Sequence, residues 1–424
     1  MLTGVFMQIF AASYVLPISS PPIAGGAIAV RNGRIVDVGP VDALRAAWHA
    51  PVRDYPGGLI IPGLVNAHTH LELTHFPAWK IRKDLDYAPR TYVDWVIQVI
   101  KIKRGLEIQE LEMSLLEGIR ISLEAGTTAI GDVLSDRRLL HVYSGSDFAG
   151  RLFLEALGQE PAPCKALAGK LEETLRTFHG GGTLPGLSPH APHTLSPAFF
   201  RELKQLAAAH SVPVMTHLSE SPEEAAFMHD STGRIAETLY PFVRWEGYLP
   251  APMRTTSTVY LDGMGILDPT TIAVHCVHIT PADAEILKKR GVCAVICPRS
   301  NEKLAVGMAP FHLLKTAGIP LALGTDSLAS NDSLSMWDEM RFVLAETPDA
   351  FTPEELLRMA SLGGAEVLGL SDAIGSLEKG KRADFLVVGA SGKDMHRALI
   401  EEGRLDEVFV AGVPIAEQSR SEGT

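Results

Sequence analysis

Two histidines, two residues apart, are the first residues in the sequence that could perform chemistry. His68 and His70 lie in the segment Asn66-Ala67-His68-Thr69-His70, which follows the apolar run GLIIPGLV. Side chains at positions i and i+2 of a strand point to the same face, so both imidazoles can reach one metal ion. Pairs of this kind are also common on polar surfaces, so this pair alone does not establish a metal site.

Polar residues also stand where three other apolar, strand-like runs end. His217 ends the run PVMTH, His275 lies in TIAVHCVH, and Asp326 ends IPLALGTD. Any one of these histidines could be a core residue whose hydrogen bonds are satisfied. Five polar residues at the ends of separate strands, counting the histidine pair, instead predict one shared site.

Glu220 adds a candidate acid–base group to this set. It follows His217 by three residues, so a turn that starts at the histidine could bring its carboxylate to the open side of a metal. A carboxylate beside a metal-bound water can take the proton of that water and pass it on. The alternative is a solvated glutamate at the start of a helix, and the nearby His217 favours the proton shuttle.

The elements that must position these residues fall into three zones. Residues 1–60 and 371–424 have the pattern of short strands with tight turns, including a hairpin at Asn32-Gly33. In residues 61–370, strand-like runs alternate with helix-length segments about eight times, which is typical of an α/β barrel. We therefore predict a (β/α)₈ TIM-type barrel with a small β-sandwich domain formed by both chain termini. In such a barrel, chemistry is located at the C-terminal ends of the strands.

The composition excludes several classes of protein. The chain has 424 residues, of which 46% are hydrophobic, and this excludes wholesale disorder. Its 38 Lys+Arg and 50 Asp+Glu give a net charge of −12. A chain this acidic lacks the cluster of basic residues that is typical of a nucleic-acid-binding protein. Its 4 cysteines are too few for a disulfide scaffold and favour a reducing compartment.

The apolar N-terminal run MLTGVFMQIFAASYVLP predicts a β-strand. It has no basic start, is interrupted by Gly4, Gln8 and Ser13, and is too short to span a bilayer. We expect a cytoplasmic protein that acts on a small molecule and binds neither nucleic acid nor membrane. The sequence leaves open whether it forms a homo-oligomer.

Together these motifs resemble the amidohydrolase superfamily, in its branch of aminohydrolases and chlorohydrolases. The motifs span nearly the whole chain: PGLVNAHTHLE, SPHAPHTLSP, THLSES, VHCVHIT, CPRSN, GTDSLASND and GSLEKGKRADFLVV. This branch contains guanine, cytosine and S-adenosylhomocysteine/methylthioadenosine deaminases. The resemblance implies a metal-dependent hydrolase that removes an exocyclic amine from a heterocycle and releases ammonia.

The resemblance also implies one divalent metal per chain and its four ligands: His68, His70, His217 and Asp326. We expect Zn²⁺, with Fe²⁺ or Mn²⁺ as alternatives, because three histidines and a carboxylate suit all three metals. Glu220 is then the proton shuttle, and His275 polarises the substrate or orients the water. Asp326 can both bind the metal and accept the proton of the metal-bound water. Binuclear relatives carry a modified bridging lysine at the end of the fourth strand. We place that strand at RLFLEALG, and its lack of lysine supports a single metal.

The sequence constrains the substrate contacts least. His190 in SPHAPHT ends a strand, and the resemblance implies that it contacts substrate, although it could instead cap its loop. Arg299 follows the seventh strand and could bind a carboxylate or a nucleoside hydroxyl, or could hold its loop. Trp95, like Tyr92, lies in a helix-patterned segment, where an aromatic ring could cover a purine or pack within the helix.

The substrate we expect is a 6-aminopurine nucleoside with a polar or anionic 5′ arm. Aminodeoxyfutalosine is the first candidate, followed by S-adenosylhomocysteine and methylthioadenosine. Alternatives are a guanine or cytosine deaminase and a chlorotriazine-type or cyclic-amide hydrolase using the same metal. A non-catalytic binding barrel is a further alternative; it predicts the loss of a metal or shuttle residue, and the motifs retain all of them.

Overall fold

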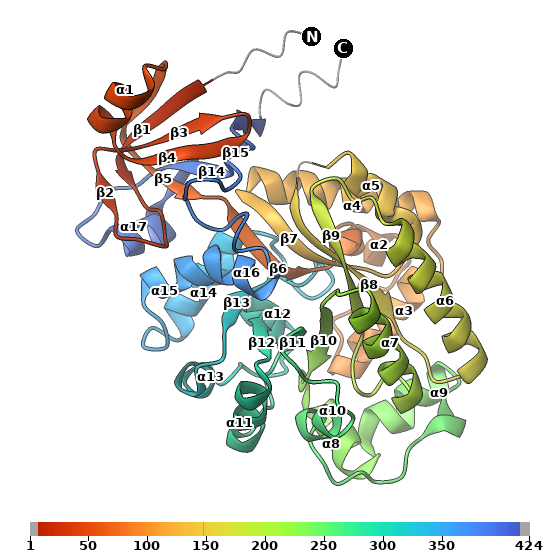
Figure 1. Ribbon diagram of the computed structural model, residues 1–424. Helices are drawn as coiled ribbons and strands as arrows, with labels where there is room; N and C mark the ends of the chain where they lie inside the picture. The colour runs from red at the N-terminus through yellow and green to blue at the C-terminus, as the bar shows by residue number, and fades with distance from the viewer. Residues whose placement is uncertain (1–6, 147, 416–424) are drawn as a thin grey trace.

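Eight parallel strands form the central barrel of the computed structural model, which describes residues 7–146 and 148–415 (Figure 1). Neighbouring strands follow the order of the chain: β6 (Leu64–Thr69), β7 (Thr127–Leu134), β8 (Ala149–Ala156), β9 (Thr183–Pro189), β10 (Val214–Leu218), β11 (Thr271–His275), β12 (Cys293–Ile296) and β13 (Leu321–Leu323). The ring closes just beyond β13, where the Asp326 amide donates to the His68 carbonyl at 3.1 Å. Two of the predicted site residues therefore close the barrel.

Side chains alternate between the inside and the outside of this barrel, as the two-residue period of a strand requires. Phe153, Met215 and Val295 belong to the core inside the barrel, whereas Leu154 and Leu218 pack in a different core. The principal helices that cover the outside are α4 (Ile108–Glu124), α6 (Pro161–Thr177), α7 (Pro197–Ala209), α10 (Ser257–Gly263), α11 (Pro281–Arg290), α13 (Phe311–Ala317), α14 (Met336–Glu346), α15 (Pro353–Met359) and α16 (Leu362–Val367).

Further helical elements lie in the segments that follow the C-terminal ends of the barrel strands. They include α2 (Phe76–Arg82), α3 (Tyr92–Lys103), α5 (Leu140–Ser144), α8 (Pro222–Asp230), a π-helical turn (Ile235–Leu239), α9 (Tyr240–Phe242) and α12 (Pro298–Lys303). Tyr92 of α3 and Phe227 of α8 pack in one apolar cluster. None of the helices in the described residues is long and apolar enough to cross a membrane.

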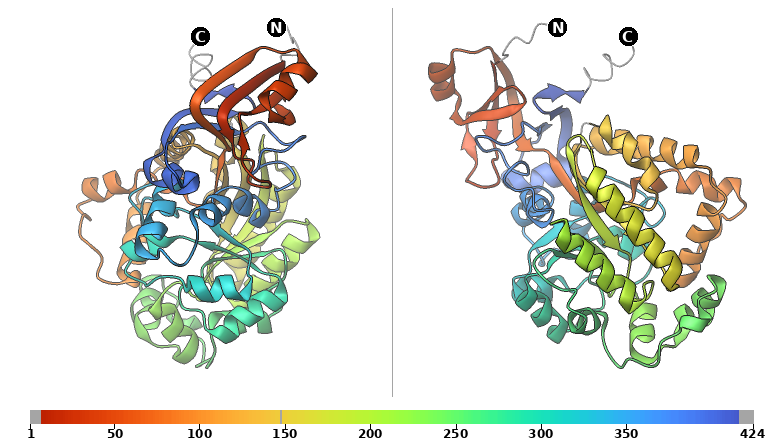
Figure 2. Two further views of the ribbon diagram at one scale, coloured as in Figure 1. Left: turned by 90° about the vertical axis from the view of Figure 1, so that its left-hand side faces the viewer. Right: turned by 45° about the vertical axis from the view of Figure 1, so that its right-hand side comes forward.

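Both ends of the chain build a second sheet beside the barrel (Figures 1 and 2). It contains β1 (Met7–Val15), β2 (Ile23–Ala24), β3 (Gly26–Arg31), β4 (Arg34–Pro40), β5 (Val52–Pro62), β14 (Phe385–Gly389), β15 (Arg404–Val410) and β16 (Val413–Pro414), with α1 (Val41–Trp48) and α17 (Met395–Glu402). The rings of Phe385 and Phe409 stack 4.3 Å apart, and Phe10 lies against both. The predicted fold class, a (β/α)₈ barrel with a β-sandwich from the termini, is confirmed.

The structure corrects two details of the sequence analysis. The run GLII belongs to β5 of the terminal sheet, and the chain enters the barrel only after Gly63, where a side chain would lie 2.0 Å from the Thr128 hydroxyl. RLFLEALG forms the third barrel strand, because β6 and β7 precede it, so the fourth is β9. Since Thr183–Pro189 also contains no lysine, the fourth strand still lacks that residue.

The boundaries at residues 60 and 370 stay predictions. The β5 strand continues to Pro62, and the terminal sheet resumes with β14 at Phe385. Residues 1–6 of the predicted N-terminal strand lie outside the described residues, as do residues 416–424 of the predicted C-terminal zone.

Candidate active site

Five predicted residues meet at the C-terminal ends of the barrel strands: His68, His70, His217, His275 and Asp326. The imidazole Nε2 atoms of His68 and His70 each lie 3.7 Å from Asp326 Oδ1. Nitrogen atoms of His68, His217 and His275 lie within 4.8 Å of one another. The His70 side chain, at 12% exposure, is the most accessible of the three groups in these ion-pair contacts. The strands therefore bring together residues that are up to 258 positions apart.

Hydrogen bonds fix the orientation of three of these rings. Nδ1 of His217 donates to the His190 carbonyl at 2.9 Å, and Nδ1 of His275 donates to Asn301 Oδ1 at 2.9 Å. Nδ1 of His68 lies 3.2 Å from the sulfur of Met215. In a neutral imidazole, this leaves the lone pair on Nε2, the atom that can bind a metal.

The imidazoles of His68, His70, His217 and His275 all have lowered pKa values and are neutral at pH 7. Burial lowers the pKa of His217 to about 4 and the pKa of His70 to about 3, and it lowers the pKa of His68 well below its usual value. Nε2 of His68 and Nε2 of His275 are buried and make no hydrogen bond within the described part of the chain. A buried lone pair without a donor is costly, and a metal ion would satisfy several of them together.

Asp326 supplies the negative charge of the cluster. Burial alone would raise the pKa of Asp326, but His70 and the hydroxyls of Ser300 and Ser330 outweigh it and hold the pKa below its usual value. Both hydroxyls donate to Oδ2 at 2.7 Å, so Oδ1 is left facing the histidines. An ionised carboxylate beside neutral imidazoles is the donor set of a divalent metal site.

The backbone is strained at three of these strand ends. Ser219, His275, Cys276 and Asp326 have left-handed φ values of 52°, 72°, 51° and 58°. Residues other than glycine rarely adopt this conformation, and such residues cluster at functional sites. The turns at the ends of β10, β11 and β13 therefore direct functional side chains inward.

Glu220 is held in place through its neighbour Glu224. The Glu224 carboxylate accepts from the amides of Ser219 and Glu220, at 2.9 and 3.0 Å, and also from the hydroxyl of Ser257. These bonds shape the turn that follows β10. The predicted turn after His217 is thus present, and α8 begins only at Pro222.

The Glu220 carboxylate itself faces the histidines. Its Oε1 lies 3.6 Å from His275 Nε2, and its Oε2 accepts from the Tyr92 hydroxyl at 2.9 Å. Burial raises the pKa of Glu220 to about 8, against the opposing effects of His217 and the Tyr92 hydroxyl. A carboxyl group that titrates near neutrality can both accept and donate a proton, as an acid–base catalyst must.

The predicted substrate contacts lie in different surroundings. His190 follows β9 beside this cluster, is partly exposed, and has Nδ1 3.0 Å from the Thr194 hydroxyl. Trp95 stacks near Tyr92, with ring centroids 5.6 Å apart, and its indole nitrogen donates to the Ala329 carbonyl at 2.9 Å. His190 therefore borders the site beside His217, and Trp95 borders it beside Tyr92.

Arg299 is engaged by its own surroundings. Its Nε donates to Asn331 at 3.3 Å, its guanidinium contacts Asp332, and its amide donates to Glu339 at 3.2 Å. These contacts are those expected if Arg299 holds its loop, which was one of the two roles considered for it. Whether Arg299 also contacts the substrate stays a prediction.

Sequence reasoning did not assign roles to three residues that support the site. Tyr92 was considered only as an aromatic cover, yet its hydroxyl contacts Glu220. Glu224 in HLSESPEE and Asn301 in CPRSN lie within or next to the motifs, but no spacing rule connects them to Glu220 and His275. Proximity to a motif was their only signal.

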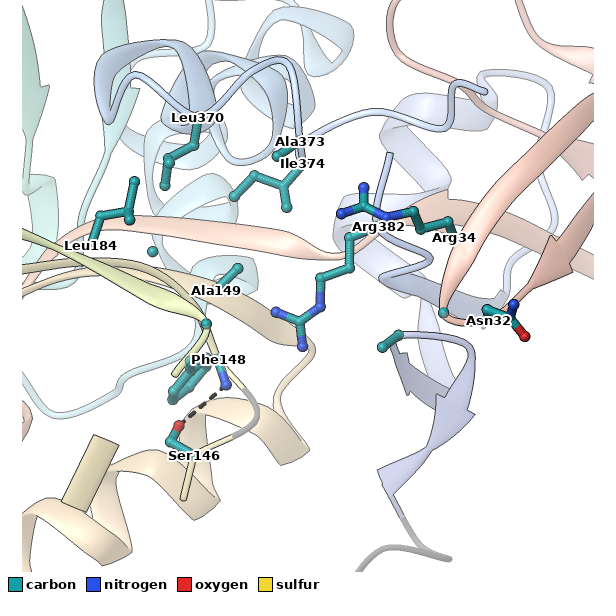
Figure 3. A pocket seen from close by; sticks show the side chains of 14 residues that line it. Asn32, Arg34, Ser146, Phe148, Ala149, Leu184, Leu370, Ala373, Ile374 and Arg382 are labelled. Atoms are coloured by element: carbon teal, nitrogen blue, oxygen red, sulfur yellow. Dashed lines mark hydrogen bonds between the residues drawn. The ribbon is translucent and has the colours of Figure 1, made fainter. Parts of the chain in front are cut away.

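A separate cavity of about 500 Å³ lies between the terminal sheet and the barrel (Figure 3). Arg34 and Arg382 line it from one side, and Phe148, Leu184 and Leu370 from the other. Since Phe148 and Leu184 mark the beginnings of β8 and β9, this cavity lies at the opposite end of the strands from the histidines.

The parallel barrel and its His/Asp cluster at the strand ends define a barrel hydrolase. The chain belongs to the amidohydrolase family, whose sequence profile matches residues 59–415. Residues 26–50 also match an imidazolonepropionase-like composite domain of bacteria. The predicted superfamily is thereby confirmed, and family membership supports a divalent metal and a small-molecule substrate.

Several known proteins are similar over most of their length. A 5-methylthioadenosine/S-adenosylhomocysteine deaminase of Nitratidesulfovibrio vulgaris (strain DP4) is 34% identical over 390 residues, which cover 88% of this chain and 81% of the relative. An aminodeoxyfutalosine deaminase of Deinococcus radiodurans is 30% identical over 356 residues, 81% of each chain. The crystal structure of an adenosine deaminase from Xanthomonas campestris with bound zinc has a TM-score of 0.81 and 28% identity, and the match covers 96% of this chain and 92% of that one. The enzyme class predicted from the sequence, a metal-dependent hydrolytic deaminase, is confirmed.

Proposed function

We propose that the protein holds one divalent metal and deaminates a 6-aminopurine nucleoside. The proposed ligands are His68, His70, His217 and Asp326. The observation that carries the proposal is the convergence of neutral, buried imidazoles beside the ionised Asp326, among which the buried Nε2 of His68 makes no hydrogen bond in the described residues. Zinc fits this donor set, and the zinc-bound adenosine deaminase supports that choice, with Fe²⁺ and Mn²⁺ as alternatives.

A divalent metal bound by these residues would acidify a water molecule and so supply the nucleophile for hydrolysis. Glu220 accepts a proton from the attacking water at Oε1 or Oε2 and passes it to a ring nitrogen of the substrate. The Tyr92 hydroxyl fixes the orientation of Oε2, and His275 borders Oε1 at 3.6 Å. Water adds to the carbon that bears the amine, ammonia leaves, and a carbonyl remains.

The substrate class follows from this geometry together with the named relatives. The ring must lie against Glu220, with its amine-bearing carbon over the centre of the cluster. Two relatives are named as deaminases of 5-methylthioadenosine/S-adenosylhomocysteine and of aminodeoxyfutalosine, compounds that are adenosine derivatives changed at the 5′ position. We propose the same class here, with aminodeoxyfutalosine, S-adenosylhomocysteine and methylthioadenosine as candidates.

A screen of ammonia release by the zinc-loaded protein tests this proposal. The panel contains adenosine, methylthioadenosine, S-adenosylhomocysteine, aminodeoxyfutalosine, guanine and cytosine, with a chlorotriazine as the probe for chloride release. We expect the highest kcat/KM for a 5′-substituted adenosine. A preference for guanine, cytosine or the chlorotriazine would overturn the substrate class and leave the metal chemistry intact.

A further inference from the structure

One carboxylate near the site has no part in the chemistry proposed above. Glu155 is the penultimate residue of β8, and in the described residues it makes no hydrogen bond and no ion pair. Phe153, two residues earlier, points into the core inside the barrel, so the two-residue period also directs Glu155 inward. Since it lies near the C-terminal end of the strand, it is on the same side of the barrel as the histidines.

The surroundings of Glu155 confirm that it borders the site. The next residue, Ala156, accepts at its carbonyl from the His190 amide at 3.0 Å, and His190 in turn accepts from His217. Burial raises the pKa of Glu155, while Lys103 and, to a smaller extent, His217 lower it. Both Glu155 and His190 are partly exposed, so they face the open part of the site.

Lys103, the cation with the largest effect on the pKa of Glu155, is bound to a different carboxylate. Lys103 donates to Glu72 Oε1 at 2.7 Å and to the Ser135 hydroxyl at 2.5 Å. Glu72 is fully buried, and its charge is balanced by this lysine. Lys103 also lowers the pKa of Glu155, but it makes no hydrogen bond or ion pair with Glu155 in the described residues, so the Glu155 oxygens are available as acceptors.

His190 adds a second acceptor to this side. The Thr194 hydroxyl donates to the Ala191 carbonyl at 3.0 Å, so it accepts from Nδ1 of His190 at 3.0 Å. With Nδ1 as the donor, the neutral imidazole of His190 carries its lone pair on Nε2. Ser188, the register partner of Glu155 on β9, has a buried hydroxyl that makes no hydrogen bond in the described part of the chain.

These groups lie on β8 and at the end of β9, next to the strand end that carries Glu220. Glu220 and His275 occupy the ends of β10 and β11, and the purine ring is placed against them by the proposed function. The sugar and its 5′ arm are then directed toward the neighbouring strands. We propose that Glu155, together with His190, forms an acceptor-lined subsite that binds a hydroxyl or ammonium group of the substituent and disfavours a carboxylate.

This subsite determines specificity among the candidate nucleosides and rests on the proposed function. It predicts that a neutral or cationic 5′ arm is accepted better than an anionic one. From the sequence we expected a polar or anionic 5′ arm, with Arg299 either binding a carboxylate or holding its loop. The structure shows Arg299 engaged by Asn331 and Asp332.

Three probes that differ only at the 5′ position test the subsite: 5′-amino-5′-deoxyadenosine, 5′-methylthioadenosine and adenosine-5′-carboxylate. We expect the zinc-loaded enzyme to have a higher kcat/KM for the amine than for the carboxylate. In Glu155→Gln this ratio should fall by about tenfold to hundredfold, the usual effect of one hydrogen bond to a charged group. Both kcat/KM values are measured with the same enzyme preparation, so a smaller fraction of active enzyme does not change their ratio.

Two further variants serve as controls. Glu160→Gln changes an exposed carboxylate a few residues beyond β8 and should leave the ratio unchanged. Glu155→Asp keeps the charge and should keep the preference for the amine. An unchanged ratio in Glu155→Gln, or a preference of the unmodified enzyme for the carboxylate, overturns the subsite alone. Failure to release ammonia from all three probes overturns the proposed function as well.

Discussion

At the scale of single residues, the site depends on which nitrogen or oxygen of each group is left without a partner. Backbone and amide acceptors occupy Nδ1 of His217 and His275, so Nε2 of each ring is available. Two serine hydroxyls occupy one oxygen of Asp326 and leave the other for the cluster. The sequence predicted the ligating residue types, because they end apolar runs. Their partners could not be predicted, since Asn301 and Ser300 lie far from His275 and Asp326 along the chain.

Glu220→Gln should separate proton transfer from metal binding. The substitution keeps the shape of the side chain and the bond from Tyr92 but removes the base. We expect kcat to fall by about 10²–10⁴, the usual contribution of general acid–base catalysis, while metal content stays near that of the unmodified protein. Ammonia release and elemental analysis measure the two quantities. Loss of metal together with a disturbed fold would show that Glu220 is a structural residue.

Tyr92→Phe should shift the pH dependence of the reaction. The Tyr92 hydroxyl donates to ionised Glu220 and so lowers the pKa of that carboxyl group, although burial keeps it raised overall. Removing the hydroxyl raises the pKa of Glu220 further. A smaller fraction of Glu220 is then ionised at a given pH, so the acid limb of the kcat/KM profile should move to higher pH. Tyr87→Phe, which changes an exposed ring, is the matched control, and a shift to lower pH would contradict the assignment.

At the scale of elements, the alternation of strands and helices could be predicted from the sequence, but not every boundary could. GLIIPGLV is one apolar run, yet it is divided between β5 and β6, because the chain passes Thr128 at Gly63 with no room for a side chain. This close approach is a long-range contact that no local pattern records. RLFLEALG was taken for the fourth strand, but it is the third, because only β6 and β7 precede it in the barrel. The ends of β10, β11 and β13 were placed correctly, because each apolar run stops at a polar residue.

Arg299→Ala tests whether Arg299 of α12 stabilises the segment that follows β13. Asn331, which Arg299 contacts, donates to the Thr325 carbonyl at 2.8 Å and so supports the turn that carries Asp326. We expect kcat/KM to fall by the same factor, about tenfold, for methylthioadenosine and adenosine-5′-carboxylate, as for other partners that orient a metal ligand. Steady-state kinetics with both substrates measure this. A rise in KM confined to the carboxylate would instead establish Arg299 as a substrate contact.

At the scale of the whole molecule, the residues that close the barrel are also proposed metal ligands. Asp326 joins the first strand through the His68 carbonyl, and Asn66 on the same strand exchanges two hydrogen bonds with Thr325. The terminal sheet borders the beginnings of β8 and β9, at the end of the barrel opposite the histidines. A metal that binds residues from β6, β10 and the segment after β13 therefore links distant parts of the chain.

Removal of the metal should accordingly lower thermal stability as well as activity. A ligand that binds only the folded state adds about 4 kcal/mol when its free concentration is a thousand times Kd, so chelation should lower Tm by several degrees. Added Zn²⁺ should restore both Tm and ammonia release, whereas Asp326→Asn should show a much smaller response of Tm to zinc. Calorimetry with and without chelator measures this, and elemental analysis should find about one metal per chain, as expected for three histidines and one carboxylate. Two tightly bound metals per chain, or a Tm that does not respond to chelation, would contradict a single metal that closes the barrel.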